Sequence, residues 1–212
     1  MNVVILAAGE FPRKAYPKIL LFGADKVVCC DSALKTALRL GVNVDVGIGD
    51  MDSVSTPVLE KFKGKIVQVP EQETNDLTKA MRFVLEEWPE ADQIVILGGT
   101  GKREDHTVGN LSLLMEYEKQ YGLWERGISV QMISDWSTAF AVGNSCSLMV
   151  GEGRSVSLLT CDTTLKLKSE GLEWPLEGVE LSNWWRATLN RATSDEIKLE
   201  FNHPAPLLVI LN

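Results

Sequence analysis

Two carboxylates stand two residues apart in the stretch "VGIGDMDS" (46–53), behind glycines and a short apolar run. Asp50 and Asp52 repel each other unless a cation neutralises them. Carboxylate oxygens are hard ligands that suit Mg²⁺, which takes a few carboxylates and completes its shell with water and phosphate oxygens. The spacing therefore indicates a metal site that holds a phosphate-bearing ligand.

Further acids stand at equivalent places along the chain. Asp31, Asp76 and Asp105 each follow a short apolar run, directly or after a loop. In a parallel sheet all of these positions lie at the carboxyl edge, where open α/β folds bind ligands. An Asp at a helix start is also a common cap, so Asp31 and Asp105 have that second interpretation. Asp45 is interpreted as a turn or loop acid rather than a metal ligand.

The segment "LGGTGKREDH" (97–106) combines glycines with two cations. Its glycines let the backbone approach a phosphate closely, and the positive charges of Lys102 and Arg103 can neutralise the negative charge of the phosphate. It is not a Walker loop, because that motif needs Gly at 96 and Ser or Thr at 103, where the chain has Ile96 and Arg103. His106 is either a phosphate contact or a helix-start histidine bonded to backbone. Together with the acids, this loop favours a Mg²⁺–nucleotide site.

A second interpretation of the acidic block comes from phosphatases. "DMDSV" (50–54) fits the DxDx[TV] pattern of haloacid-dehalogenase-type phosphatases, whose first Asp is a nucleophile. That motif normally follows a long apolar strand near the chain start, whereas here it follows a short, glycine-interrupted run. A downstream acid pair of the GDxxxD type is missing. A phosphatase of the DxD type stays open as an alternative.

The first two-thirds of the chain alternates short apolar runs with helical patterns. Continuous apolar runs are typical of strands that are covered on both faces, and strands alternating with helices predict a parallel, doubly wound sheet. Asp31 and Asn75 are the expected caps of two of the helices. The predicted strands are 2–8, 26–30, 46–48, 65–69, 93–97 and 128–134, and the predicted helices are 31–41, 75–88 and 105–121.

The pattern changes after about residue 136. Short β-rich runs follow, separated by Gly, Pro, Asp and Asn, with no convincing helix between them. This is typical of a small antiparallel sandwich or half-barrel. The sequence thus predicts an α/β catalytic domain over 1–136, with helices on both faces of a mostly parallel sheet, and a β-sandwich domain over 137–212. The predicted strands of the second domain are 145–150, 154–160, 164–169, 196–201 and 206–211.

The composition and charge of the chain argue against several classes of protein. The formal net charge of −8 and the lack of a basic stripe argue against general nucleic-acid binding. The apolar runs are too short to span a bilayer, and no basic leader precedes the first strand, so neither a membrane anchor nor a secretory signal is expected. The four cysteines lack metal-site spacing and are interpreted as reduced thiols of a cytoplasmic protein.

Several blocks, in this order, resemble the thiamine pyrophosphokinase (thiamin diphosphokinase) family. That family carries a DGG-like turn, a GDxDS block, a Q-x-x-T-D-x-x-K block and a GGxxGRxDH-like loop, followed by a β-rich domain with a G-L-x-W/Y-x-L motif and a final Ser-Asn segment. This chain has "CDSALKTALRLGVNVDVGIGDMDS", "EQETNDLTKAM", "ILGGTGKREDHTVGNLSLL", "SEGLEWPLEG" and "LNRATSDEIKLEF". The resemblance covers nearly the whole chain, and its blocks are specific when taken together.

The resemblance implies transfer of a pyrophosphoryl group from Mg-ATP to the hydroxyl of thiamine, giving thiamine diphosphate and AMP, by a homodimer with active sites at the subunit interface. It implies that Asp50, Asp52 and Asp76 hold Mg²⁺ and act in catalysis with Lys79. Trp174 is expected to stack on the thiamine pyrimidine, and Asn190 to hydrogen-bond it. The residues expected to bind the nucleotide are Asp31, Gln72, Gly99, Thr100, Arg103, Asp105 and His106.

Some positions depart from the family pattern. The DGG turn reads Asp31-Ser32-Ala33, and Leu189 stands where the family has Ser before Asn190. Because of Leu189, the sequence leaves open whether the substrate that accepts the pyrophosphoryl group is thiamine or a related pyrimidine alcohol. A nucleotide-binding regulatory module of the same fold, without turnover, is a further alternative.

Overall fold

The computed structural model describes residues 1–52 and 54–212, so Ser53 of the acidic block lies outside the described residues. The chain divides into two compact units, which are described separately. The first comprises Met1–Asn110 and Ile128–Asp135, and the second comprises Leu111–Gly127 and Trp136–Asn212. The domain boundary predicted at 136–137 stays a prediction.

The first unit is built on a parallel sheet. Its described strands lie in the order β6-β5-β1-β2-β3-β4, and each neighbouring pair is parallel. Its elements are β1 (Asn2–Leu6), α1 (Ala15–Phe22), β2 (Lys26–Cys30), α2 (Ala33–Arg39), β3 (Val46–Gly49), α3 (Thr56–Lys61), β4 (Lys65–Gln68), α4 (Asp76–Glu87), β5 (Gln93–Leu97) and β6 (Ser129–Ile133). The helix α5 (Glu104–Tyr121) begins in this unit and belongs to the second unit from Leu111 on.

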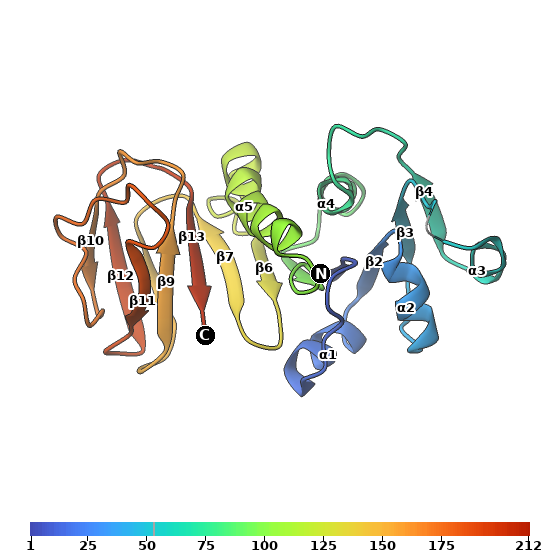
Figure 1. Cartoon of the computed structure of the whole chain (residues 1–212), viewed down its shortest axis with the longest axis horizontal. Coiled ribbons are helices and arrows are strands. Elements are labelled where there is room, and N and C mark those ends of the chain that lie inside the picture. The colour runs from blue at the N-terminus through green and yellow to red at the C-terminus, as the bar shows by residue number, and fades with distance from the viewer. Residues whose placement is uncertain (53) are drawn as a thin grey trace. The chain divides into compact units, whose positions relative to one another are not determined.

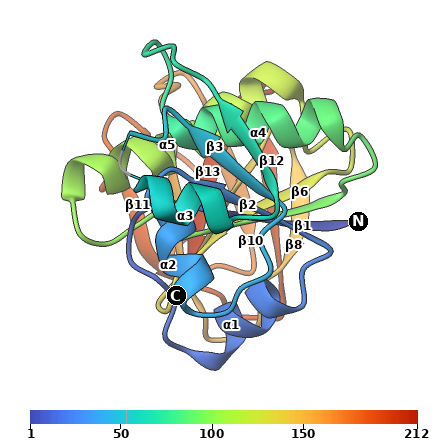
Figure 2. The same ribbon diagram turned by 90° about the vertical axis from the view of Figure 1, so that its right-hand side faces the viewer.

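Helices cover both faces of this sheet, as Figure 2 shows for α1 and α2 on one side and α4 on the other. Alternate strand residues such as Val4, Leu6 and Cys29 share a buried cluster with Leu21 of α1 and Leu34 of α2. The intervening strand residues are equally buried, and α4 contacts β1, β2 and β3. Successive strand side chains point to opposite faces, so a sheet covered on both sides needs apolar residues at every position.

The second unit contains antiparallel strands in two groups (Figure 1). One has the order β11-β9-β13-β7 and the other the order β10-β12-β8. Their inward side chains form one buried cluster, to which both groups contribute. The strands are β7 (Thr138–Val142), β8 (Cys146–Met149), β9 (Ser155–Leu159), β10 (Leu167–Glu170), β11 (Ala187–Arg191), β12 (Glu196–Phe201) and β13 (Leu207–Leu211).

The predicted fold class is confirmed, and some local predictions are wrong. Asp31 does not cap a helix: its φ is +41°, and α2 begins after Ser32, whose own side chain makes no capping hydrogen bond. Asn75 caps α4 as predicted, since its side chain accepts from the N–H of Thr78 at 2.9 Å. The elements absent from the prediction are α1, α3, β7 and β11. Within the described residues, no helix is both long and apolar enough to cross a membrane.

Candidate functional site

The loops that follow β1 and β5 are joined by backbone hydrogen bonds at the carboxyl edge of the first unit's sheet. The N–H of Gly9 donates to the Gly98 carbonyl and the N–H of Glu10 donates to the Thr100 carbonyl, both at 2.8 Å. A Cβ on Gly9 would lie 2.3 Å from the Gly98 oxygen, so only glycine permits this approach. The chain leaves β1 toward β2 but reaches β5 on the other side of β1, which makes this edge the switch point where α/β sheets bind ligands.

At the tip of the loop after β5, the positively charged side chain of Lys102 is held in place. Gly101 and Lys102 both have positive φ, at +77° and +66°, and a lysine rarely adopts that conformation. The Lys102 ammonium donates to the Ala8 carbonyl at 2.7 Å, which ties the tip to the loop after β1. The strained backbone and the tether together hold a positive charge at the switch point.

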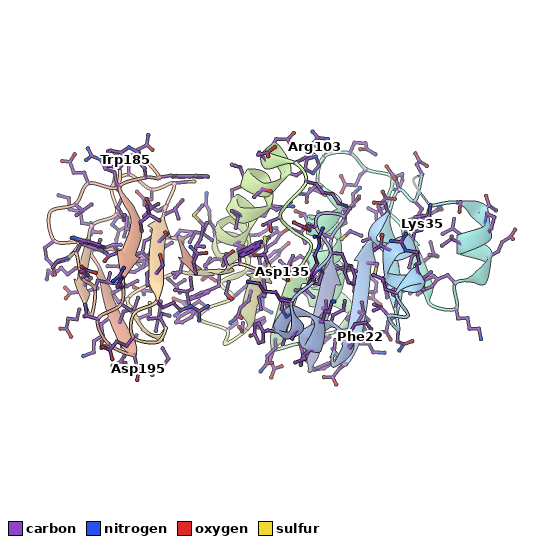
Figure 3. All side chains as sticks on the ribbon, turned by 60° about the horizontal axis from the view of Figure 1, so that its bottom comes forward. Phe22, Lys35, Arg103, Asp135, Trp185 and Asp195 are labelled. Atoms are coloured by element: carbon purple, nitrogen blue, oxygen red, sulfur yellow. The ribbon has the colours of Figure 1, made fainter. Side chains whose placement is uncertain are left out.

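Arg103, labelled in Figure 3, stands next to Lys102 and just before α5. Its guanidinium makes a bidentate pair with Asp105, whose carboxylate also accepts from the His106 N–H at 2.9 Å. The guanidinium is the main reason why the pKa of Asp105 is lowered to about 2. Asp105 therefore stays ionised near neutral pH and orients Arg103, and its role in nucleotide binding stays a prediction.

Two acids meet at the end of β3, on either side of a glycine. Gly49 has a φ of +144°, and a Cβ there would lie 3.3 Å from the Asp31 Cβ and 3.3 Å from Oδ1 of Asp76. The Cys30 thiol donates to the Asp76 carbonyl at 3.5 Å. Burial raises the pKa of this thiol well above its ordinary value, so the free thiol stays protonated near neutral pH.

Lys79 holds Asp76 in place. Its ammonium lies 3.2 Å from Oδ1 of Asp76, and its side chain is buried, whereas the Asp76 carboxylate is partly exposed. A buried ammonium needs a compensating partner, and Asp76 on the first turn of α4 supplies it. Lys79 thus holds the Asp76 carboxylate in place, and its predicted catalytic role stays a prediction.

Asp50 and Asp52 lie beyond β3, on a loop of their own. Oδ1 of Asp50 accepts from the Asp52 N–H at 3.2 Å, and Met51 between them has a φ of +62° and a buried side chain. The buried Met51 turns its two neighbours outward, Asp52 being exposed and Asp50 half-buried. Asp45 lies at the amino end of β3 and pairs with Lys26 at 2.8 Å, which places it away from the site.

The described residues contain no group of three or more His, Cys, Asp or Glu side chains that could hold a metal ion by themselves. The metal role of Asp50, Asp52 and Asp76 therefore stays a prediction. The donor chemistry still fits Mg²⁺, because this ion is usually held by one or two carboxylates together with substrate phosphates and water.

Gln72 stands on the loop between β4 and α4, with its side chain exposed. The Glu71 carboxylate orders this loop, since it accepts from the N–H groups of Glu73 at 2.8 Å and of Thr74 at 3.0 Å. It also accepts from the Thr74 hydroxyl, which is the main cause of its lowered pKa. The loop thus presents Gln72 to solvent on a fixed backbone.

A cavity of about 300 Å³ lies between these loops. Asp31, Asp76, Lys102 and Arg103 all line it, so acids and cations share one cavity. Of the predicted residues, Gly99 and His106 also line it, whereas Asp50, Asp52, Gln72, Lys79, Thr100 and Asp105 do not. Its remaining lining residues are Ala7, Ala8, Gly9, Cys30, Asn75, Leu77, Gly101 and Asn110.

Two asparagines of this lining are not among the site residues predicted from the sequence. The buried Asn110 donates from Nδ2 to the Gly99 carbonyl at 2.7 Å, and its Oδ1 accepts from Nδ2 of Asn75 at 3.3 Å. This bridge links the start of α4 to the glycine loop. The sequence predicts Asn75 only as a helix cap, and Asn110 lies inside a helical pattern with nothing to distinguish it as a site residue. The loop at Ala7–Gly9 was missed too, although a glycine directly after the first strand was a usable signal.

The predicted thiamine-binding residues lie in the second unit. Trp174 is 55% exposed, and Asn190 is buried. Oδ1 of Asn190 accepts from the Trp174 N–H at 3.1 Å, and its Nδ2 donates to the Trp174 carbonyl at 2.7 Å. In this structure Asn190 thus holds the backbone of Trp174 and so presents its ring. Leu189 beside it is 74% exposed, with a φ of +59°, at an irregularity in the pairing of β11 with β9.

Comparisons with known proteins identify both units. The family model described as "Thiamin pyrophosphokinase, catalytic domain" matches residues 18–123, and the one described as "Thiamin pyrophosphokinase, substrate-binding domain" matches residues 139–205. The chain is 25% identical to Thiamine pyrophosphokinase 1 of Oryza sativa subsp. japonica over 159 residues, covering 68% of this chain and 57% of that protein. It is 38% identical to Thiamin pyrophosphokinase 1 of Caenorhabditis elegans over 74 residues, covering 32% of this chain and 30% of that protein.

The matches thus span less than two-thirds of these relatives' own length. Among solved structures, the fold is similar to a thiamin pyrophosphokinase family protein from Enterococcus faecalis. The TM-score is 0.79 at 20% identity, over 100% of this chain and 99% of the other.

Proposed function

The chain belongs to the thiamin pyrophosphokinase family, and from this premise we propose that it transfers the pyrophosphoryl group of ATP to the hydroxyl of thiamine. The products are thiamine diphosphate and AMP. The observation that carries the proposal is the cavity that is lined both by Asp31 and Asp76 and by Lys102 and Arg103. Phosphoryl-transfer sites need this combination, because catalysis is mostly the positioning of substrates and the stabilisation of phosphate charge.

The reaction is an in-line displacement at the β-phosphorus. The thiamine hydroxyl oxygen forms a bond to this phosphorus, and the bond to the oxygen bridging the α- and β-phosphates breaks, so AMP leaves with that oxygen. Lys102, fixed by the Ala8 carbonyl, and Arg103, fixed by Asp105, bind phosphate oxygens. We assign Asp76 as the acceptor of the hydroxyl proton, since Lys79 holds its carboxylate at the cavity wall.

Mg²⁺ is part of the proposal. Asp50, Asp52 and Asp76 are the carboxylates that would hold it, with phosphate oxygens and water completing the shell. When bound, the ion neutralises developing charge on the phosphates.

Trp174 is the proposed platform for thiamine. Thiamine is a cation with aromatic rings, and an exposed indole offers it stacking and cation–π attraction. The two hydrogen bonds between the Asn190 side chain and the Trp174 backbone, one in each direction, support an orienting role for Asn190, beside the direct contact with thiamine that the resemblance implies. Leu189 offers thiamine no hydroxyl, so selectivity for the pyrimidine is proposed to rest on shape and stacking.

One assay tests the proposed reaction. The purified chain is incubated with thiamine, ATP and Mg²⁺, and the nucleotides and thiamine esters are separated. We expect AMP and thiamine diphosphate in equal amounts. ADP with thiamine monophosphate would instead identify an ordinary kinase, and nucleotide binding without any AMP would identify a regulatory module.

We also propose that the chain acts as a homodimer in the cytoplasm. The family resemblance supports the dimer, and exposed apolar side chains of the second unit, including Trp174, Trp185 and Leu189, offer surface for a contact. Cysteines without disulfides among the described residues are in keeping with a reducing compartment. Light scattering after size-exclusion chromatography tests the dimer, and a monomer at micromolar concentration would contradict it.

A further inference from the structure

Asp135 lies two residues after β6, at the carboxyl edge of the first unit's sheet, and it is labelled in Figure 3. Unlike Asp31 and Asp76, it does not line the cavity described above. Its carboxylate binds backbone instead. The N–H of Arg13 donates to both of its oxygens at 3.0 Å, and the N–H of Lys14 donates to Oδ1 at 2.9 Å. Asp135 thus holds the far end of the loop that follows β1.

These two N–H groups stand at the start of α1, a helix that has no cap of its own. Lys14 occupies the N-cap position, but its side chain makes no capping hydrogen bond, and the first turn of α1 contains no acidic residue. The first N–H groups of a helix have no partner inside it, and the helix dipole favours a negative charge at that end. Asp135 supplies both the acceptor and the charge from a distant part of the sequence.

The loop between β1 and α1, residues 7–14, is fixed at both of its ends. It contains no helix or strand, and all of its residues except Pro12 are exposed or half-buried. Next to β1 it is bonded to the loop after β5 through the N–H groups of Gly9 and Glu10. Next to α1 its fixed point is Asp135. An irregular, exposed segment opens more readily than a core strand, so each anchor restricts the whole loop.

The loop in turn carries an acceptor for a cation of the phosphate site. The Ala8 carbonyl accepts from the Lys102 ammonium at 2.7 Å. An ammonium has three donors on a flexible stem, so one hydrogen bond to a fixed carbonyl restricts its position and leaves the other donors for phosphate oxygens. Lys102 is therefore held only as firmly as the loop that carries Ala8.

We propose that Asp135 is a positioning residue for phosphate transfer: it caps α1 from a distance, fixes the loop 7–14, and through the Ala8 carbonyl keeps the Lys102 ammonium in place for the phosphate chain. The inference rests on the proposed function, in which Lys102 binds phosphate oxygens. Asp135 acts indirectly, because backbone N–H groups bind both of its oxygens and its negative charge would repel a phosphate.

The first test removes the anchor. In Asp135→Ala, we expect the dissociation constant for Mg-ATP, measured by calorimetry without thiamine, to rise about fivefold to tenfold. The kcat/KM for ATP should fall by about tenfold, while the KM for thiamine stays within about twofold of the original chain. Asp135→Asn keeps an oxygen that can accept from the backbone, so it should lose only about threefold on either measure. This milder variant replaces Asp135→Ala in every comparison if the alanine variant does not fold.

Asp25→Ala is the matched control for a loss of stability alone. Oδ2 of Asp25 accepts from the Asn2 N–H at 2.8 Å, so this exposed carboxylate also holds backbone, but at the amino end of β1. Both alanine variants should unfold at lower urea than the original chain, and only Asp135→Ala should lose affinity for Mg-ATP. An equal loss of affinity in Asp25→Ala would assign the effect to general destabilisation and refute the positioning role.

A double-mutant cycle tests whether the effect passes through Lys102. Lys102→Ala removes the ammonium, so adding Asp135→Ala to it should weaken the binding of Mg-ATP by less than about twofold further. Losses that multiply in the double variant would show that Asp135 does not act through Lys102, and the inference would be wrong.

The two proposals fail in different ways. If the original chain forms thiamine diphosphate, yet Asp135→Ala binds Mg-ATP as tightly as the original chain does, the positioning role is refuted and the reaction stands. If the original chain binds Mg-ATP without forming AMP, yet Asp135→Ala weakens this binding and adds nothing to the loss in Lys102→Ala, the proposed reaction is wrong and the positioning role stands.

Discussion

At the scale of single residues, Gly49 decides how two acids of the site lie. Side chains rarely adopt its φ of +144°, and a Cβ there would press against the Asp76 carboxylate at 3.3 Å. We predict that Gly49→Ala lowers the free energy of unfolding by about 1–3 kcal/mol, through backbone strain. It should also lower kcat, because Asp76 must move. Urea unfolding and steady-state kinetics measure the two effects.

A second glycine provides the control for this substitution. Gly109 lies in α5, and a Cβ there would meet nothing within 4 Å. Gly109→Ala should therefore leave kcat unchanged and raise stability by up to about 1 kcal/mol, since alanine favours the helix. Equal destabilisation by both substitutions would show that the positive φ of Gly49 carries no special cost.

For Asp52 we predict an effect on activity without an effect on stability. Its side chain is exposed and accepts no described hydrogen bond on which the fold depends. Asp52→Asn should reduce metal-dependent turnover by about 100-fold or more. Its free energy of unfolding should change by no more than about 0.5 kcal/mol. Glu86→Gln, an exposed acid of α4 outside the cavity, should change neither quantity. Wild-type turnover in Asp52→Asn would remove this residue from the site.

Part of the site could be predicted from residue types, and part could not. Acids after consecutive strands place Asp31 and Asp76 at one edge, because parallel strands all end there. The spacing of Asp50 and Asp52 in the sequence does not reveal that Met51 between them is buried and that both acids therefore point outward from the loop after β3. Backbone conformations such as the positive φ of Asp31 are set by tertiary contacts, so a local cap pattern gave the wrong answer.

At the scale of elements, periodicity predicts the buried strands well and the short elements poorly. The strands β2 and β5 have the predicted bounds, because an apolar run between polar ends leaves few alternatives. The helix α1 is short, contains Pro17 and exposes Tyr16, Ile19 and Phe22, so its apolar pattern does not mark one buried face. Strand β11 is interrupted by an irregularity near Leu189, which breaks the alternation.

The end of α5 carries a buried carboxylate that makes stability depend on pH. Glu118 accepts from the Trp124 N–H at 2.9 Å, and a Cβ on Gly143 would lie 2.5 Å from its other oxygen. Burial raises its pKa above the ordinary 4.5. The folded chain thus binds this proton more tightly than the unfolded chain, and stability falls as pH rises from 4.5 through the raised pKa.

Replacing this carboxylate by an amide tests the predicted direction of the pH dependence of stability. Glu118→Gln cannot ionise but keeps an oxygen that can accept from Trp124. We expect urea midpoints of the variant to fall less than those of the original chain as pH rises above 4.5. Glu116→Gln, at an exposed position of the same helix, should leave the pH dependence as it is. A steeper fall in Glu118→Gln would contradict the assignment to burial.

At the scale of the whole molecule, each unit has a hydrophobic core of its own residues. A structural metal site needs a closed set of protein ligands, and the described residues provide no group of three or more acidic, His or Cys side chains for one. The fold should therefore not depend on the ion, whereas phosphate transfer should.

This separation predicts the effect of a chelator. EDTA in excess over Mg²⁺ should abolish AMP formation, while the thermal midpoint measured without nucleotide shifts by less than about 2 °C, because no folding energy is linked to metal binding. Activity should return when Mg²⁺ is restored. If EDTA instead lowers the midpoint strongly in the absence of nucleotide, the metal contributes to the fold, and the carboxylates near β3 hold it before any substrate arrives.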